Sequence, residues 1–217
     1  MSAHDLVVDA TERLFNRKDL SVVDERFGPV YVQHSALGPD GVDGLKGLLA
    51  SLPETSSYEL VRVLADGDLV VTEGVFSGFA PVPLTGYDVW RLDGDRVVEH
   101  WDALGPGVAR TSPETPTPED ADPSANRKLV TAWIEDVLIG RAQAQEVPAV
   151  GFDPTVTYVR LHTVIADRDL VYTRSEGDRG GAVIVNDVWR LEDGRIVERW
   201  GLTVPVPANL PHDNGSF

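Results

Sequence analysis

Apolar and polar residues alternate along four stretches in the first half of the chain, a pattern typical of half-buried β-strands. The stretches are residues 58–65, 69–76, 87–92 and 96–104. Asp66-Gly67 separates the first two, and Asp93-Gly94-Asp95 separates the last two. Asp-Gly turns between apolar runs are a strong hairpin signal. We therefore predict two hairpins that contribute to one antiparallel sheet.

Apolar residues three and four positions apart predict helices ahead of these strands. The first helix is expected to end near residues 16–18, and a short helix at 21–26 and a short strand at 30–33 follow it. Another helix is predicted at 41–52. The apolar face of the first helix comprises Leu6, Val7, Ala10, Leu14 and Phe15. Helices followed by a strand meander predict an α+β fold, with the helices on one face of an antiparallel sheet.

The second half of the chain repeats part of this pattern. Residues 88–101 read DVWRLDGDRVVEHW and residues 187–200 read DVWRLEDGRIVERW, so nine of these fourteen positions are identical. Upstream, VLADGDLVVT at 63–72 matches VIADRDLVYT at 164–173. Two copies indicate a duplication, because a solenoid needs three or more units.

A stretch rich in proline and acid separates the two copies. Residues 111–124 read TSPETPTPEDADPS, which offers no large apolar side chain to bury, and such segments tend to stay extended. We therefore predict domains at 1–110 and 125–217, joined by this linker. The second copy has no sequence corresponding to residues 31–52. We expect it to be a degenerate domain without a closed pocket.

The composition narrows the range of partners. The chain has 19 basic and 35 acidic residues, and the basic residues do not cluster, so nucleic acid and anionic membranes are not expected partners. It contains no cysteine, which excludes disulfides and thiolate chemistry. No stretch approaches the roughly 18 consecutive apolar residues of a membrane span. We expect a cytoplasmic protein.

Strand periodicity places ionisable side chains near one end of the first sheet. Side chains alternate between the faces of a strand, so His100 and Asp102 share a face. With a turn at residues 93–95, we expect Asp88 on the neighbouring strand to lie opposite His100, with Asp102 one step further along. These three residues would then lie at one end of the sheet.

Such a group could support proton transfer. A carboxylate in an apolar pocket loses hydration, its pKa rises, and it becomes a usable base near neutral pH. Two alternatives stay open. Asp102 could be a solvated acid at a strand end, and Asp88 could be structural, because Asp187 occupies its position in the second copy.

Three segments of the first copy resemble a known family. They are YVQHSALGPDGVDGLKGLL at 31–49, VLADGDLVVT at 63–72 and YDVWRLDGDRVVEHWDAL at 87–104. They resemble the SnoaL-like polyketide cyclases of the nuclear-transport-factor-two-like superfamily, which also includes ketosteroid isomerase and limonene epoxide hydrolase. The resemblance implies a cystatin-like cone, in which helices wrap a curved antiparallel sheet around an apolar pocket. We therefore expect two tandem cones, of which the second is truncated.

The resemblance also implies roles for individual residues. An acid–base Asp lies at the position of Asp102 in the family, and its polar partner lies at the position of Asp88. The family partner is a His in the best-known members, so Asp88 is a departure. His34 matches a family His that could bond a carbonyl or orient an acid. The expected pocket wall, for which ordinary core packing is the alternative, comprises Tyr31, Tyr58, Phe76, Phe79 and Trp90.

We expect a cyclase or isomerase that acts on a small apolar carbonyl compound without metal or cofactor. Asp102 would remove a proton next to the carbonyl, and His34 or His100 would stabilise the enolate oxygen. The alternative is a non-catalytic ligand-binding or assembly module with a vestigial pocket. An epoxide hydrolase-like activity ranks third, because no arginine completes an Asp-Arg-Asp set. No metal-binding or phosphate-binding motif is found in the sequence.

The second copy lacks the expected base, because Arg199 and Gly201 stand at the positions of His100 and Asp102. We expect it to cover the sheet of the first copy as an intrachain pseudo-dimer. Whether this pair forms a further homodimer stays open.

Overall fold

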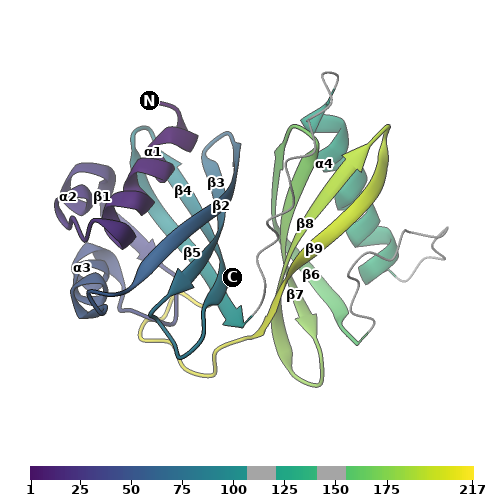
Figure 1. The fold of residues 1–217 in the computed structure, drawn as a ribbon. Coiled ribbons are helices and arrows are strands. Elements are labelled where there is room, and N and C mark those ends of the chain that lie inside the picture. The colour runs from purple at the N-terminus through teal and green to yellow at the C-terminus, as the bar shows by residue number, and fades with distance from the viewer. Residues whose placement is uncertain (107–120, 141–154) are drawn as a thin grey trace. The chain divides into compact units, whose positions relative to one another are not determined.

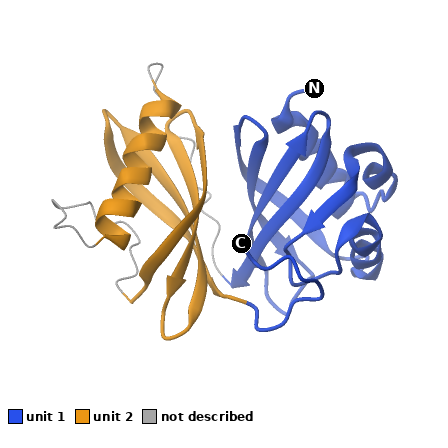
Figure 2. Ribbon diagram, turned by 180° about the vertical axis from the view of Figure 1, so that it is seen from behind, with its two compact units in different colours: residues 1–109, 207–217 blue, residues 110–206 orange. Residues whose placement is uncertain are grey.

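The computed structural model describes residues 1–106, 121–140 and 155–217. The chain divides into two compact units (Figure 2), with residues 1–109 and 207–217 in unit 1 and residues 110–206 in unit 2. The sequence predicts 125–217 as one domain, but residues 207–217 belong to unit 1, because they hydrogen-bond to its Gln33–Ser35 segment. Most of the predicted linker at 111–124 lies outside the described residues, and its last two residues begin a helix.

Unit 1 packs its helices on one face of a five-stranded sheet (Figure 1). The helical elements are α1 (Ala3–Thr11), the π-helical turn η1 (Glu12–Asn16), α2 (Ser21–Arg26) and α3 (Gly41–Ser51). The strands are β1 (Phe27–Gln33), β2 (Ser57–Asp66), β3 (Leu69–Ser77), β4 (Leu84–Asp93) and β5 (Arg96–Pro106). The sheet order is β1-β5-β4-β3-β2, and the strands pair antiparallel except for β1, which runs parallel to β5. This is the α+β architecture that the sequence predicts.

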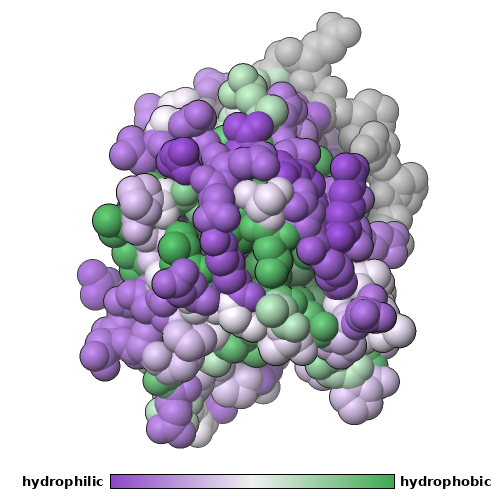
Figure 3. Space-filling model, turned by 90° about the vertical axis from the view of Figure 1, so that its left-hand side faces the viewer, coloured by the Kyte–Doolittle hydropathy of each residue, from purple (hydrophilic) through white to green (hydrophobic). Residues whose placement is uncertain are grey.

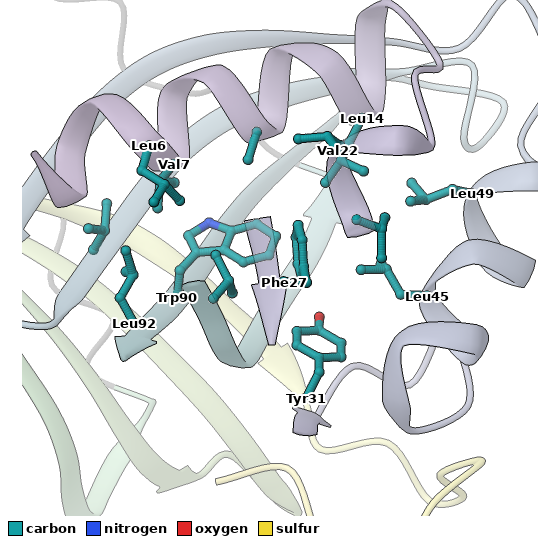
Figure 4. Packing of buried hydrophobic residues seen from close by; sticks show 14 residues of the cluster. Leu6, Val7, Leu14, Val22, Phe27, Tyr31, Leu45, Leu49, Trp90 and Leu92 are labelled. Carbon is teal, nitrogen blue, oxygen red and sulfur yellow. The ribbon is translucent and has the colours of Figure 1, made fainter. Parts of the chain in front are cut away.

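The first helix forms where the apolar periodicity places it. Ser2 caps α1 by accepting a hydrogen bond from the Asp5 amide at 3.1 Å, which satisfies one of the free amides at the helix start. Its buried residues Leu6 and Val7 pack toward Trp90 on β4 (Figure 4). The shared core, which α2, α3 and β1 also enter, holds the helices against the sheet.

A bulge in β5 sets the register of the β4–β5 hairpin. Its turn is Gly94-Asp95, with Gly94 at φ 61°, a conformation that glycine adopts without strain. Arg91 pairs with Glu99 but Leu92 pairs with Val97, which leaves Val98 as the extra residue. Asp88 therefore lies opposite Asp102, and Trp90 opposite His100. The predicted pairing of Asp88 with His100 was wrong by two positions, because the turn is shorter than expected and the bulge adds a residue.

Unit 2 repeats the last four strands of unit 1 and one helix. Its elements are α4 (Pro123–Ala132), η2 (Trp133–Ile139), β6 (Thr157–Asp167), β7 (Leu170–Asp178), β8 (Ala182–Glu192) and β9 (Arg195–Pro205). The sheet order is β6-β7-β8-β9, and a separate core forms around Val130, Ile134 and Trp189. In the described parts of unit 2, no element corresponds to β1 or α3 of unit 1. The structure thus contains two α+β units, of which the second has fewer elements in its described residues.

One side of the protein surface is largely polar (Figure 3). The side of the molecule shown in Figure 3 is predominantly hydrophilic, with smaller hydrophobic areas between the polar side chains. This agrees with the formal net charge of −16. Among the described helices, none combines the length and the apolar character needed to cross a bilayer.

A buried ion pair lies in the sheet of unit 2. Asp187 on β8 accepts hydrogen bonds from Arg199 on β9, at 2.9 Å from Nε and 2.5 Å from Nη2. The Tyr158 hydroxyl donates to the second Asp187 oxygen at 2.7 Å and accepts from Arg199 Nη2 at 2.7 Å. The three groups hydrogen-bond one another, but the loss of hydration still raises the pKa of Asp187.

Arg199→Met is expected to lower the free energy of unfolding by about 3–5 kcal/mol, because it leaves the Asp187 charge buried without its partner. Urea denaturation at pH 7 measures this. The double variant Asp187→Asn/Arg199→Met should recover much of the loss, since no buried charge remains. Arg195→Met, which changes an exposed arginine on the same strand, is the control. Equal losses in the single and double variants would contradict this account.

Candidate functional site

A small cavity lies inside unit 1, between the sheet and α3. Its apolar wall is contributed by Phe15, Leu37, Leu45, Leu48, Leu49, Leu52, Phe76, Phe79, Trp90 and Leu104. Its polar wall is contributed by Gln33, Ser35, Asp88, His100 and Asp102. The volume is about 30 Å³, enough for about one water molecule, whereas small-molecule sites usually measure about 300–1,000 Å³.

Asp88 and His100 form a buried pair in this wall. Both are less than a tenth exposed, and His100 Nε2 lies 3.2 Å from Asp88 Oδ1. The His100 ring also stacks on Trp90, with ring centres 4.0 Å apart. The pair comes from neighbouring strands, and its side chains meet on the diagonal because the β5 bulge places Asp102 directly opposite Asp88.

Gln33 determines which nitrogen of His100 carries a proton. The Ser35 amide donates to Gln33 Oε1 at 3.1 Å, which fixes the orientation of the Gln33 side chain. Gln33 Oε1 also lies 2.9 Å from His100 Nδ1, so Nδ1 must be the donor. One further proton is then shared between His100 Nε2 and Asp88 Oδ1, either as a neutral pair or as an ion pair.

Burial changes the chemistry of Asp88. The loss of hydration raises the pKa of this carboxyl group to about 8. Its second oxygen, Oδ2, is buried with no hydrogen-bond partner among the described residues. A buried oxygen without a hydrogen-bond partner costs stability in a closed core. It is the atom of the pair that could accept a hydrogen bond from a ligand.

Asp102 faces the same cavity in a different environment. It is only half-buried, and its Oδ2 accepts a hydrogen bond from the Ser35 hydroxyl at 2.6 Å. The Ser35 hydroxyl in turn accepts from the Leu37 amide at 3.1 Å. The structure therefore places Asp102 in the wall of a hollow with Asp88 on the adjacent strand, rather than in bulk solvent.

His34 lies away from the cavity. Its Nε2 is 2.9 Å from Glu99 Oε1, and its ring stacks on Trp101 at 4.7 Å. The reason is the parallel pairing of β1 with β5, which aligns Gln33 with His100 and turns the next residue to the opposite face. His34, predicted as a pocket residue, is therefore not among the residues that line this cavity.

The predicted aromatic wall divides in two. Phe76, Phe79 and Trp90 line the cavity, whereas Tyr31 and Tyr58 are buried outside its lining. The Tyr31 hydroxyl accepts a hydrogen bond from Gln33 Nε2 at 3.2 Å, so it helps to hold the Gln33 side chain in place from outside the cavity lining.

Sequence reasoning missed Gln33 and Ser35. Gln33 is the last residue of β1, and Ser35 lies in the loop that follows it. Alternation along 30–33 could have placed Gln33 on the inner face. The contact of Ser35 with Asp102 depends on the path of the loop, which no local pattern predicts.

The described residues of unit 2 form no equivalent site. Arg199 occupies the position of His100 and pairs fully with Asp187. A side chain at Gly201, the position of Asp102, would collide with the backbone of Asn186. Within the described ranges of both units, no group of three His, Asp or Glu side chains is arranged to hold a metal ion.

The raised pKa of Asp88 predicts how the free energy of unfolding depends on pH. An unfolded Asp titrates near about 3.9, so between that pH and about 8 the folded state holds one more proton. The resulting stabilisation is complete below pH ~4 and is lost as the pH rises through about 8, by up to about 1.4 kcal/mol per pH unit. Asp88→Asn cannot ionise, so relative to the parent chain it should gain about 1–3 kcal/mol in unfolding free energy between pH 5 and pH 8.

Chemical denaturation at a series of pH values measures this gain. Asp95→Asn, a change at an exposed turn residue, should show no such trend. A parent chain and an Asp88→Asn variant with parallel pH profiles would show that Asp88 titrates normally.

Comparison with known proteins identifies the first unit. Residues 8–100 match the family model described as the SnoaL-like domain. No curated protein matches the sequence. Among solved structures, IdmH from Streptomyces antibioticus, a candidate polyketide cyclase, is 22% identical, with 48% of this chain and 92% of that chain covered and a TM-score of 0.41.

Two other solved structures are similar over the same extent. TsrD from Streptomyces laurentii is 18% identical, with 47% of this chain and 87% of that chain covered and a TM-score of 0.41. An LEH-like epoxide hydrolase from M. tuberculosis is 23% identical, with 48% and 82% covered and a TM-score of 0.40. The family match confirms the resemblance seen in the sequence of the first copy, and it ends before unit 2. Residues 8–100 of this chain are thus similar to the SnoaL-like domain family, over less than half of the chain.

Proposed function

We propose that unit 1 catalyses proton transfer at a carbon next to a carbonyl group, as a cyclase or isomerase that uses its own side chains and no cofactor. One observation carries the proposal. A buried, proton-sharing Asp88–His100 pair and the carboxylate of Asp102 line the same apolar cavity. Two acid–base groups in different environments are what enolisation requires, because one must accept a proton while the other supplies one.

The surroundings of Asp102 and of the Asp88–His100 pair indicate which group accepts the proton and which group supplies one. Asp102 is half-buried, accepts a hydrogen bond from the Ser35 hydroxyl and faces the cavity, so its carboxylate would act as the base. It would take the proton from the α-carbon as that C–H bond breaks. The Asp88–His100 pair would give its shared proton to the developing enolate oxygen. Return of the Asp102 proton to another carbon, while the enol O–H proton goes back to the Asp88–His100 pair, completes an isomerisation. In a cyclisation the enol carbon attacks a second carbonyl, the oxygen of that carbonyl takes the proton from Asp102, and the enol O–H proton again returns to the pair.

The apolar wall fits a small apolar carbonyl compound, but the cavity must widen to admit one. Its volume of about 30 Å³ is far below that of a ligand site. Leu37, which is 54% exposed, lies in the wall on the loop between β1 and α3, so movement there would open the cavity.

The small volume favours a second candidate, a non-catalytic module whose pocket is vestigial. In that case Asp88 and His100 would serve the fold alone. Among the described residues, the cavity lining contains no arginine. An Asp-Arg-Asp set for epoxide hydrolysis is therefore not formed there, and we do not propose that activity.

Asp102→Asn tests the base. Deuterium uptake by 2-indanone, a small apolar ketone, is followed in D₂O by ¹H NMR. The variant should exchange at least about 100-fold more slowly, because an amide cannot accept the proton. Its melting temperature should change little, and Asp95→Asn should match the parent chain. A folded Asp102→Asn variant with full activity would overturn the role of Asp102, and a parent chain inactive on such ketones would favour the non-catalytic module.

The pH profile tests the partner. Because burial raises the pKa of Asp88 to about 8, the pair holds its proton below that pH and loses it above. The exchange rate is therefore expected to fall as the pH rises through about 8. Asp88→Asn should lower the rate and remove this fall. A rate that rises through the same range would instead identify Asp88 as the base.

A further inference from the structure

The C-terminal segment, residues 207–217, lies on unit 1 although it follows the last strand of unit 2 (Figure 2). It contacts three consecutive residues at the end of β1 and just after it. Asn214 Nδ2 donates to the Gln33 carbonyl at 2.9 Å, and His212 Nε2 lies 2.9 Å from the Ser35 carbonyl. His34 Nδ1 lies 3.0 Å from the Gly215 carbonyl.

The tautomer of His212 follows from its neighbours. A carbonyl oxygen can only accept, so Nε2 must donate to Ser35. Nδ1 accepts from the Asn214 amide at 3.4 Å, which agrees with this assignment. His212 and Asn214 therefore act together as two donors to the backbone of the Gln33–Ser35 segment.

Side chains of the Gln33–Ser35 segment also hydrogen-bond to two polar groups of the cavity wall. The Gln33 side chain receives the His100 Nδ1–H bond, and the Ser35 hydroxyl binds Asp102 at 2.6 Å. The position of the Gln33–Ser35 backbone thus determines which nitrogen of His100 carries the proton. It also determines the hydrogen bonding of Asp102.

This backbone needs an external support. β1 is the edge strand of the sheet, with β5 on one side only, so the carbonyl groups at its end have no further strand to pair with. Asp40 accepts from the Gln33 amide at 2.8 Å, and this hydrogen bond is the main reason that the pKa of Asp40 is lowered. Asn214 donates to the carbonyl of the same residue, so hydrogen bonds hold both the amide and the carbonyl of Gln33.

We propose that residues 207–217 form a strap that positions the acid–base site, with His212 and Asn214 as its positioning residues. The strap follows the last strand of unit 2 along the chain but forms part of unit 1. The catalytic consequence rests on the proposed function, but the strap itself does not.

The test uses the full-length chain with both donors removed, His212→Ala/Asn214→Ala. Amide hydrogen exchange, followed residue by residue by NMR, should become about tenfold or more faster at His34, Ser35 and Leu37. Amides of β7 and β8 should be unchanged. Asp213→Ala, an exposed position between the two donors, is the matched control and should behave like the parent chain.

His212→Gln/Asn214→Ala provides a rescue, since the Gln side chain keeps an N–H donor and should restore part of the protection. Unchanged amide exchange in the double alanine variant would overturn the strap. In the 2-indanone assay, kcat should fall about tenfold while KM changes little, because the site is misaligned rather than removed.

The two proposals fail separately. Faster amide exchange together with a parent chain inactive on ketones would sink the proposed function and support the strap. Faster amide exchange with unchanged kcat in an active enzyme would overturn the positioning role.

Discussion

The pairing of β5 with β4 on one side and with β1 on the other fixes the polar groups of unit 1. In a sheet, register decides which side chains share a face, and a shift of one residue moves a side chain to the opposite face. The bulge at Val98 sets Asp88 against Asp102 and leaves His100 beside both Asp88 and Gln33. The cavity, the shared proton and the exclusion of His34 all follow from these two pairings.

A buried Asp at the same strand position has different partners in the two units. In unit 2, Asp187 meets a permanently charged Arg199 and a tyrosine, so both of its oxygens are satisfied and the group is structural. In unit 1, Asp88 meets a titratable histidine and keeps one oxygen without a partner among the described residues. The same strand position thus gives a closed ion pair in one unit and an acid–base pair in the other. The partner residue decides, because it sets how strongly the carboxylate form is stabilised.

The site also extends beyond the matched family region. The match ends at residue 100, whereas Asp102 lies just past it and the C-terminal segment lies far beyond it. The carbonyl of Ser35, in the loop after β1, is one of the groups that the C-terminal segment supports. Residues 207–217, which follow the second copy along the chain, hydrogen-bond to this loop and to the end of the edge strand.

The sequence by itself determined the α+β class, the repeat, the helical core face and the shared face of His100 and Asp102, because these depend on periodicities of two and 3.6 residues and on turn signals. Only the tertiary structure decided the register of Asp88, the orientation of His34, the support from Gln33 and Ser35, and the position of residues 207–217. The physical reason is that these depend on a bulge, on a parallel pairing and on contacts across more than 60 positions of the chain. Local patterns carry no information on such contacts, since they form only when distant segments pack together.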